Sequence, residues 1–254
     1  MNFDIATWML VFVRVSGLFL LFPVFAATHF PARTRIALAA LSAALVTPGL
    51  PSVALSDQGI PGLVIVIGKE LGVGLLMGFV SRLIFYAAEA AGALISSEIG
   101  LSLPPSMNPI SGSQGTLFGS ILNYVAAMMW LCLDLHHWLL AGILKTFDYL
   151  PVGTAQWREP LLMEVLDRCS GIFVVALQMA APLMAVSFII SLVLSTMGRA
   201  VPQMNVFLQS FSIRILAGLT VFGTTCHLMS QHIANYLNRL PEDLLRIGQL
   251  LGQH

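Results

Sequence analysis

Long apolar runs, separated by short polar or Pro- and Gly-containing stretches, dominate this chain. Six runs reach or approach the length of about 20 residues that a helix needs to cross a bilayer. They cover about residues 5–27, 36–55, 60–88, 117–143, 171–197 and 209–230. The stretches between them hold helix-breaking residues, as in THFPARTR after the first run and TPGLPS after the second. The pattern predicts an all-α, multi-pass hydrophobic protein made of helical hairpins.

Composition supports the membrane class and excludes two others. Hydrophobic residues make up 57% of the 254 residues and charged residues only 9%, whereas a soluble globular protein carries about 25% charged residues. Twelve basic residues balance twelve acidic ones, so the chain lacks the clustered positive charge of a nucleic-acid-binding protein. Asp4 and Arg14 are atypical of a cleaved signal peptide, so we expect the first helix to be permanent.

Four charged residues interrupt the third apolar run: Lys69, Glu70, Arg82 and Glu89. An isolated charge near the bilayer centre costs at least about 2.5 kcal/mol on insertion scales. Pairing within the chain or a position near the interface would lower that cost, and surroundings other than lipid are the alternative. We therefore treat Lys69, Glu70 and Arg82 as candidate buried or interface charges.

Small residues in the same run predict close helix packing. Gly68 with Gly72, and Gly74 with Gly78, each form a G-x-x-x-G pattern that lets another helix approach closely. This expectation holds whether or not the neighbouring charges have a function.

A long central loop is predicted at about residues 96–116, where SSEIGLSLPPSMNPISGSQG contains three prolines and three glycines. The Pro-Pro and Asn-Pro steps prevent a continuous helix. The loop is long for a connection and carries apolar side chains, and long loops of this kind are often functional. An ordinary linker is the alternative.

Two polar segments lie nearer the C-terminus. Residues 153–168 are the most polar part of the chain and predict an aqueous loop with a short helix. The tail from Pro241 predicts an amphipathic helix with an apolar stripe at Leu244, Ile247 and Leu251. Whether this helix lies on a surface or docks to a partner stays open.

Reactive and metal-binding patterns are scarce in the sequence. Ser111 occupies the place of the first glycine of a G-x-S-x-G elbow, and no P-loop, C-x-x-C or H-E-x-x-H pattern occurs. His136 and His137 are adjacent, and adjacent helical side chains point about 100° apart, so we expect no metal site there. We expect no catalytic residues and no cofactor. A small-solute permease is the stronger rival reading, although matching broken helices are not evident in the two halves.

The segment GRAVPQMNVF, residues 198–207, interrupts the last two apolar runs with polar residues. A hairpin turn accounts for it locally, because Gly198 and Pro202 break the helix and the polar side chains can satisfy exposed backbone groups. The same segment also resembles the Arg-x-x-Pro-Gln segment of the FliR family of type III export-gate subunits. The matching positions are Arg199, Pro202, Gln203, Asn205 and Phe207.

Other segments resemble the same family along nearly the whole chain. HHWLLAGILKTFDYLPVG, residues 136–153, is similar to the family's histidine, apolar helix and Leu-Pro-x-Gly, and IGLSL and FPARTRIALA fit as well. The chain departs at Glu98, Asn108 and Ser212, where the family often has Gln, Asp and Pro. These departures affect the expected local geometry and not the resemblance itself.

The resemblance implies an assembly role for the whole chain, residues 1–254. About residues 1–185 would form a part like the P subunit of the gate, and about 186–254 a hairpin and tail like the Q subunit. The chain would assemble with P-like and Q-like membrane subunits and further export-apparatus membrane proteins. Unfolded protein substrates would pass in transit through the bacterial inner membrane at the flagellar basal body. The injectisome counterpart, which exports virulence effectors, is the alternative within the family.

The resemblance also gives the central loop and the hairpin tip a role. Residues 106–118 would plug the channel at rest, with flexible glycines and an apolar seal. The plug residues would be Met107, Asn108, Pro109, Ile110, Gly112, Gly115 and Phe118. The tip motif 199–207 would face the channel or neighbouring subunits.

Overall fold

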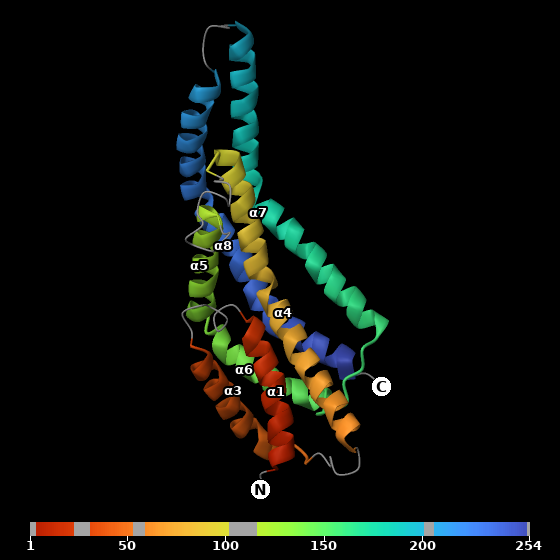
Figure 1. The fold of residues 1–254 in the computed structure, drawn as a ribbon. Helices are drawn as coiled ribbons and strands as arrows, with labels where there is room; N and C mark the ends of the chain where they lie inside the picture. Colours follow the sequence, from red (N-terminus) through yellow and green to blue (C-terminus); the bar gives the residue numbers. More distant parts are fainter. Residues whose placement is uncertain (1–3, 23–30, 53–58, 102–115, 201–205, 253–254) are drawn as a thin grey trace. The chain divides into compact units, whose positions relative to one another are not determined.

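The computed structural model describes residues 4–22, 31–52, 59–101, 116–200 and 206–252, and most of these residues are helical. Its elements are α1 (Ile5–Leu21), α3 (Ala32–Val46), the short 3-10 helix η1 (Thr47–Gly49), α4 (Gly59–Ile99), α5 (Leu117–Cys132), α6 (Leu135–Tyr149), α7 (Glu159–Ala200) and α8 (Val206–Gly252). Figure 1 shows these helices in chain order. The all-α prediction is confirmed.

The helices divide into two compact units. Unit 1 contains Met1–Leu83, Trp130–Cys169 and Asn238–His254, and unit 2 contains Ile84–Met129 and Ser170–Leu237. The long helices α4, α7 and α8 therefore each contribute one end to unit 1 and the other end to unit 2.

In unit 1, α1 packs against both α3 and the first half of α4. Asp4 caps α1, because its carboxylate accepts hydrogen bonds from the backbone N–H groups of Ala6 and Thr7. On α4, a Cβ atom added at Gly74 would overlap the backbone of Arg14, and one added at Gly78 would lie 2.8 Å from the carbonyl oxygen of Leu18. The predicted close approach at the second G-x-x-x-G pattern is thus confirmed.

The C-terminal end of α8 also belongs to unit 1. Leu244, Ile247 and Leu251 are fully buried there, and the backbone N–H of Gln156 donates to the carbonyl oxygen of Leu251 over 3.1 Å. The predicted separate tail helix is wrong, because α8 continues through Pro241 to Gly252. Its apolar stripe packs on the chain itself, so the tail is neither a free surface helix nor an open docking site.

In unit 2, α4 ends in a turn closed by two backbone hydrogen bonds. Leu101 N–H donates to the Ser96 carbonyl over 2.9 Å and Gly100 N–H to the Ser97 carbonyl over 3.2 Å. Gly100 has a φ of +84°, the left-handed conformation that ends many helices at glycine. The helix therefore extends beyond Ser96, where the loop was predicted to begin.

Two other boundaries differ from the sequence pattern. The fourth apolar run is not one helix, because α5 and α6 meet at a bend of 71°. Asp134 at this break has a left-handed φ of 52°, which ends the helical hydrogen-bond ladder locally. The predicted polar loop at 153–168 is also shorter than expected, since α7 already begins at Glu159.

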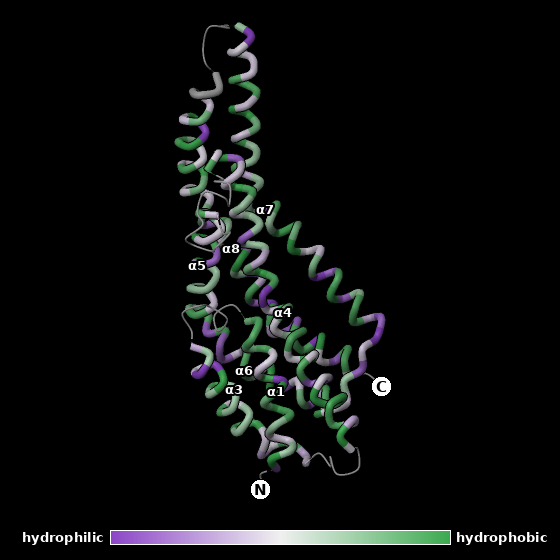
Figure 2. Tube along the Cα trace, in the orientation of Figure 1, coloured by the Kyte–Doolittle hydropathy of each residue, from purple (hydrophilic) through white to green (hydrophobic). Residues whose placement is uncertain are grey.

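Three helices are long and apolar enough to cross a membrane: Gly59–Ile99, Glu159–Ala200 and Ser210–Gly252. The bent pair α5 and α6 raises this number to four if it counts as one span. The six runs all form helices, but fewer than six of the described helices are span candidates, since α1 has only 17 residues. Figure 2 shows the hydrophobic colouring that extends along much of α4 and α7. The chain is a membrane protein.

Candidate functional site: a buried ion pair and exposed apolar helices

The best-defined polar site lies inside unit 1 and is built on Arg14 of α1 and Glu70 of α4. Arg14 Nε donates to Glu70 Oε2 over 2.6 Å, and Arg14 Nη2 donates to Glu70 Oε1 over 3.1 Å. The two side chains are 1% and 0% exposed. This bidentate geometry is the strongest pairing that an arginine makes with a carboxylate.

The same pair binds the connection between α6 and α7. Arg14 Nη1 and Nη2 each donate to the carbonyl oxygen of Leu150 over 3.2 Å, and the guanidinium carbon lies 4.1 Å from the centre of the Phe147 ring. The backbone N–H of Gly153 donates to Glu70 Oε1 over 2.7 Å. One buried ion pair therefore joins α1 and α4 to the end of α6 and the turn after it.

Removing one charge of such a pair is costly, because the remaining charge stays buried without its counter-ion. The cost measured for other buried pairs is about 3–5 kcal/mol. The contacts of the pair are with other parts of unit 1, so we expect it to fix the packing of these helices. Glu70 and Arg14 could each be identified from the sequence as a charge within an apolar run, but their pairing could not.

The other charged residues predicted on α4 have different surroundings. Lys69 and Arg82 are half-buried and Glu89 is exposed. The neighbours Lys69 and Glu70 thus differ, since only Glu70 turns into the interior of unit 1.

A second ionic cluster joins the start of α7 to the end of α8, and sequence reasoning missed it. Arg168 Nε and Nη2 donate to Glu164 Oε1 over 2.9 and 2.8 Å, and Arg168 Nη1 also donates to Asp243. Arg246 Nη2 lies 2.9 Å from Glu164 Oε2. The i,i+4 spacing of Glu164 and Arg168 was a usable signal for one of these pairs.

Unit 2 holds a smaller polar group in apolar surroundings. Arg214 Nη2 donates to Ser191 Oγ over 3.0 Å, and Ser187 Oγ donates to the carbonyl oxygen of Glu98 over 3.4 Å. Glu98, Ser187 and Arg214 line a cavity of about 10 Å³ together with apolar side chains of α4, α7 and α8. A cavity of that size holds at most one water molecule, so it is not a transport site for a solute.

Most of the predicted plug and tip residues lie outside the described part of the chain. These are Met107, Asn108, Pro109, Ile110, Gly112, Gly115, Pro202, Gln203 and Asn205. Phe207 lies in α8, with only its backbone described. Phe118 is 1% exposed and packs edge-on against the Phe222 ring, with the ring centres 4.8 Å apart. Arg199 is exposed in the last turn of α7.

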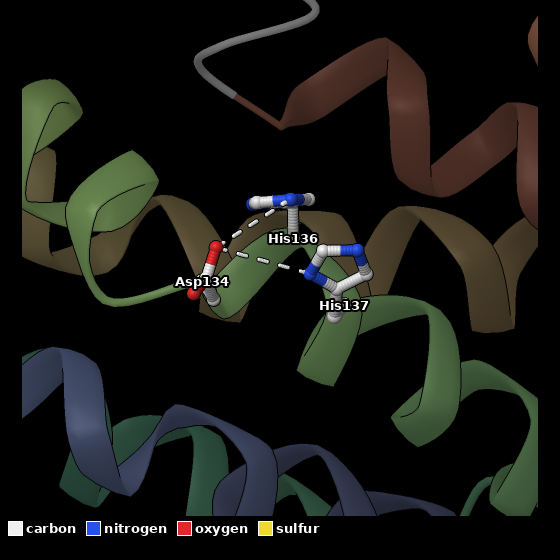
Figure 3. A group of neighbouring side chains, drawn as sticks. All are labelled: Asp134, His136 and His137. Carbon is white, nitrogen blue, oxygen red and sulfur yellow. Dashed lines mark ion pairs between the residues drawn. The ribbon is translucent and has the colours of Figure 1, made fainter.

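The adjacent histidines of α6 do not point apart as expected. The ring centres of His136 and His137 are 4.0 Å apart, and Asp134 faces both rings (Figure 3). The expectation assumed two residues inside a regular helix, whereas both histidines belong to its first turn, directly after the break.

Large apolar side chains are exposed along α7 over most of its length. They are Leu162, Met163, Leu166, Phe173, Val174, Leu177, Phe188, Ile189, Leu192, Val193 and Met197. They extend over about 53 Å of helix at 1.5 Å per residue, whereas the hydrocarbon core of a bilayer is about 30 Å thick. This exposed stretch is therefore longer than the hydrocarbon core is thick, and an apolar surface of this extent commonly marks a site of contact with lipid or protein.

These features define an integral membrane protein with a buried ion pair and an extended exposed apolar surface. Comparison with known proteins agrees. The family described as "Bacterial export proteins, family 1" matches residues 5–240. The chain therefore belongs to this family of bacterial export proteins.

Several individual relatives are similar to this chain. The flagellar biosynthetic protein FliR of Bacillus subtilis (strain 168) is 27% identical over 251 residues, covering 96% of this chain and 95% of the relative. FliR of Escherichia coli (strain K12) is 24% identical and covers 92% of the chain and 90% of the relative. The Yop proteins translocation protein T of Yersinia pestis is 26% identical and covers 67% and 66%, respectively.

Proposed function

We propose that this chain is a structural, channel-forming subunit of the bacterial flagellar type III export gate, which passes unfolded flagellar proteins across the inner membrane. The observation that carries the proposal is the family match over residues 5–240. The flagellar assignment is favoured because the Bacillus flagellar relative covers 96% of the chain, whereas the Yersinia translocation protein covers 67%.

The exposed apolar surface supports the proposed partners. The chain would assemble with P-like and Q-like gate subunits in the flagellar basal body, with helices packed against its α7 and α8. Each helix contains an apolar segment of 18 residues that is long enough to be part of a membrane span. Only 28% of this segment of α7, and none of that of α8, is buried within the chain. Each helix also has about twice the length that one bilayer crossing uses. Neighbouring subunits would bury the surface that lipid leaves uncovered.

The proposed channel plug, residues 106–118, is supported by how the flanking helices end. Gly100 closes α4 with a left-handed turn, and Phe118 is anchored on Phe222 at the start of α5. Both ends belong to unit 2. If residues 106–118 form the seal, deletion of 106–115 is expected to raise ion conductance without preventing assembly. An unchanged conductance in the assembled deletion variant would refute the plug.

The function itself is tested by complementation in the source bacterium. A strain that lacks its own copy is expected to secrete flagellin and swim when this chain is supplied.

Arg199→Ala and Gln203→Ala are expected to reduce secretion if the tip motif faces the channel or a neighbouring subunit. If the chain instead restores effector secretion in a strain whose injectisome lacks this subunit, and leaves motility unchanged, the injectisome alternative is supported.

A further inference from the structure

Three side chains that can bind metal ions meet where α5 ends and α6 begins. Asp134 Oδ1 lies 3.9 Å from His136 Nε2 and 3.9 Å from His137 Nδ1. One ligand atom from each residue lies within 4.8 Å of the other two. Figure 3 shows the carboxylate turned toward both imidazole rings. The two rings and the carboxylate therefore surround one small volume at the protein surface.

The backbone of Asp134 explains this convergence. Aspartate before a helix usually accepts a hydrogen bond from the helix's first N–H groups, but Asp134 makes no such bond to α6. Its left-handed conformation, φ 52° and ψ 26°, is uncommon for a residue other than glycine. The carboxylate faces the histidines, and the Trp130 ring lies beside His136 with centres 5.8 Å apart.

Two imidazole nitrogens and one carboxylate oxygen are the kind of ligand set that binds Zn²⁺ and similar divalent ions. Tetrahedral zinc, with bonds of about 2.0–2.2 Å, places its ligands about 3.4 Å apart. The two separations of 3.9 Å from Asp134 Oδ1 to the imidazole nitrogens are slightly longer than this. Because Asp134 and His137 are 74% and 72% exposed, their side chains have room to rotate inward around an ion.

We propose that Asp134, His136 and His137 form a site for a late first-row divalent cation such as Zn²⁺. The ligands are Asp134 Oδ1, His136 Nε2 and His137 Nδ1, with a water molecule completing the coordination. A bound ion ties the residue before α6 to the first turn of that helix and so stabilises the bend. The helix dipole disfavours a cation at this end, so the carboxylate is as necessary as the imidazoles. The proposal does not rest on the proposed function.

The test is a zinc titration of the full chain, purified in detergent with a tag that contains no histidine. Competition with a chromophoric zinc chelator measures stoichiometry and affinity. One zinc ion per chain is expected. Loss of even an outer-shell partner lowers metal affinity by about tenfold or more, so Asp134→Asn and His137→Gln are expected to lose at least that much.

Two control variants make the result specific. His227→Gln removes another exposed histidine, on α8, and is expected to bind zinc like the wild type. Cys132→Ser removes the nearby exposed thiol and is also expected to retain the site. Asparagine tolerates the left-handed backbone, and His137 is exposed, so both test variants are expected to remain folded.

A second readout separates specific binding from nonspecific association. An ion that binds only the folded state raises the unfolding temperature, so zinc is expected to raise the Tm of the wild type and of His227→Gln. The Tm of His137→Gln is expected to stay unchanged by zinc. The proposal is overturned if the wild type binds no zinc, or if Asp134→Asn and His137→Gln bind it as tightly as His227→Gln does.

Discussion

At the scale of single residues, the chain places its strongest polar interaction in an apolar interior. Arg14 and Glu70 are both fully buried, and the Glu70 carboxylate accepts hydrogen bonds from Arg14 and from the Gly153 N–H. A buried ion pair of this kind stabilises a protein little more than a well-packed apolar pair of the same size. Either charge left buried without its partner is strongly destabilising. We therefore expect the pair to determine which faces of α1 and α4 pack together.

Arg14→Ala and Glu70→Ala are each expected to destabilise the protein by about 3–5 kcal/mol, because each leaves one buried charge unpaired. The double variant Arg14→Met with Glu70→Leu is expected to be more stable than either single variant. Thermal unfolding in detergent and the amount of folded protein in membranes measure both effects.

Lys69→Met is the matched control, since Lys69 is adjacent but only half-buried. Its effect on Tm is expected to be small. If Glu70→Ala is no more destabilising than Lys69→Met, the buried pair does not hold unit 1 together.

At the scale of elements, the contact between α1 and α4 depends on the absence of side chains. An added Cβ at Gly74 would overlap the Arg14 backbone, whereas one at Gly68 would meet nothing within 4 Å. The two glycines lie on the same helix and differ only in the face that they occupy. An alanine substitution at each glycine therefore compares the effect of close helix packing, at Gly74, with the effect of helix propensity alone, at Gly68.

Gly74→Ala is expected to destabilise unit 1 by about 1–3 kcal/mol, the usual cost of overpacking. Gly68→Ala is expected to be neutral or to stabilise by up to about 1 kcal/mol, because alanine is the better helix former. Thermal unfolding of the two variants side by side tests the contact. Equal Tm values would contradict this packing of α1 on α4.

The end of α8 depends on the ionic cluster at the start of α7. Arg168→Ala removes the group that binds both Glu164 and Asp243 and leaves two poorly exposed carboxylates next to each other. Hydrogen exchange of residues 238–252 is expected to become faster in this variant. Arg246→Ala is the control, because Arg246 is 62% exposed and exposed ion pairs contribute little. Equal exchange rates in the two variants would show that Arg168 does not hold the tail.

The sequence pattern was a good guide to which segments are helical and a poor guide to where they end. Apolar runs and glycine spacing predicted the helices and the close approach at Gly74 and Gly78. The break at Asp134 was not predictable, because aspartate in a left-handed conformation depends on its surroundings and WLCLDLHHW reads as a continuous run. The continuation of α8 through Pro241 was missed for a similar reason, since tertiary packing outweighs the proline. The pairing of Arg14 with Glu70, 56 positions apart, requires three dimensions.

At the scale of the whole molecule, exposed apolar surface exceeds what a bilayer can cover. The helices α4, α7 and α8 contain 41, 42 and 47 residues, which correspond to about 60–70 Å at 1.5 Å per residue. The hydrocarbon core spans about 30 Å. The proposed place of the chain in a larger helical assembly would account for this excess, because neighbouring subunits would bury what lipid does not.

The most direct test of this account is native mass spectrometry of the tagged chain, co-expressed with the P-like and Q-like subunits of the same bacterium and extracted in mild detergent. The account predicts a discrete hetero-oligomer in which one species of fixed composition contains this chain together with several partner copies. A monomer or homodimer that leaves both partners unbound would contradict the export-gate assignment and favour a self-contained membrane transporter.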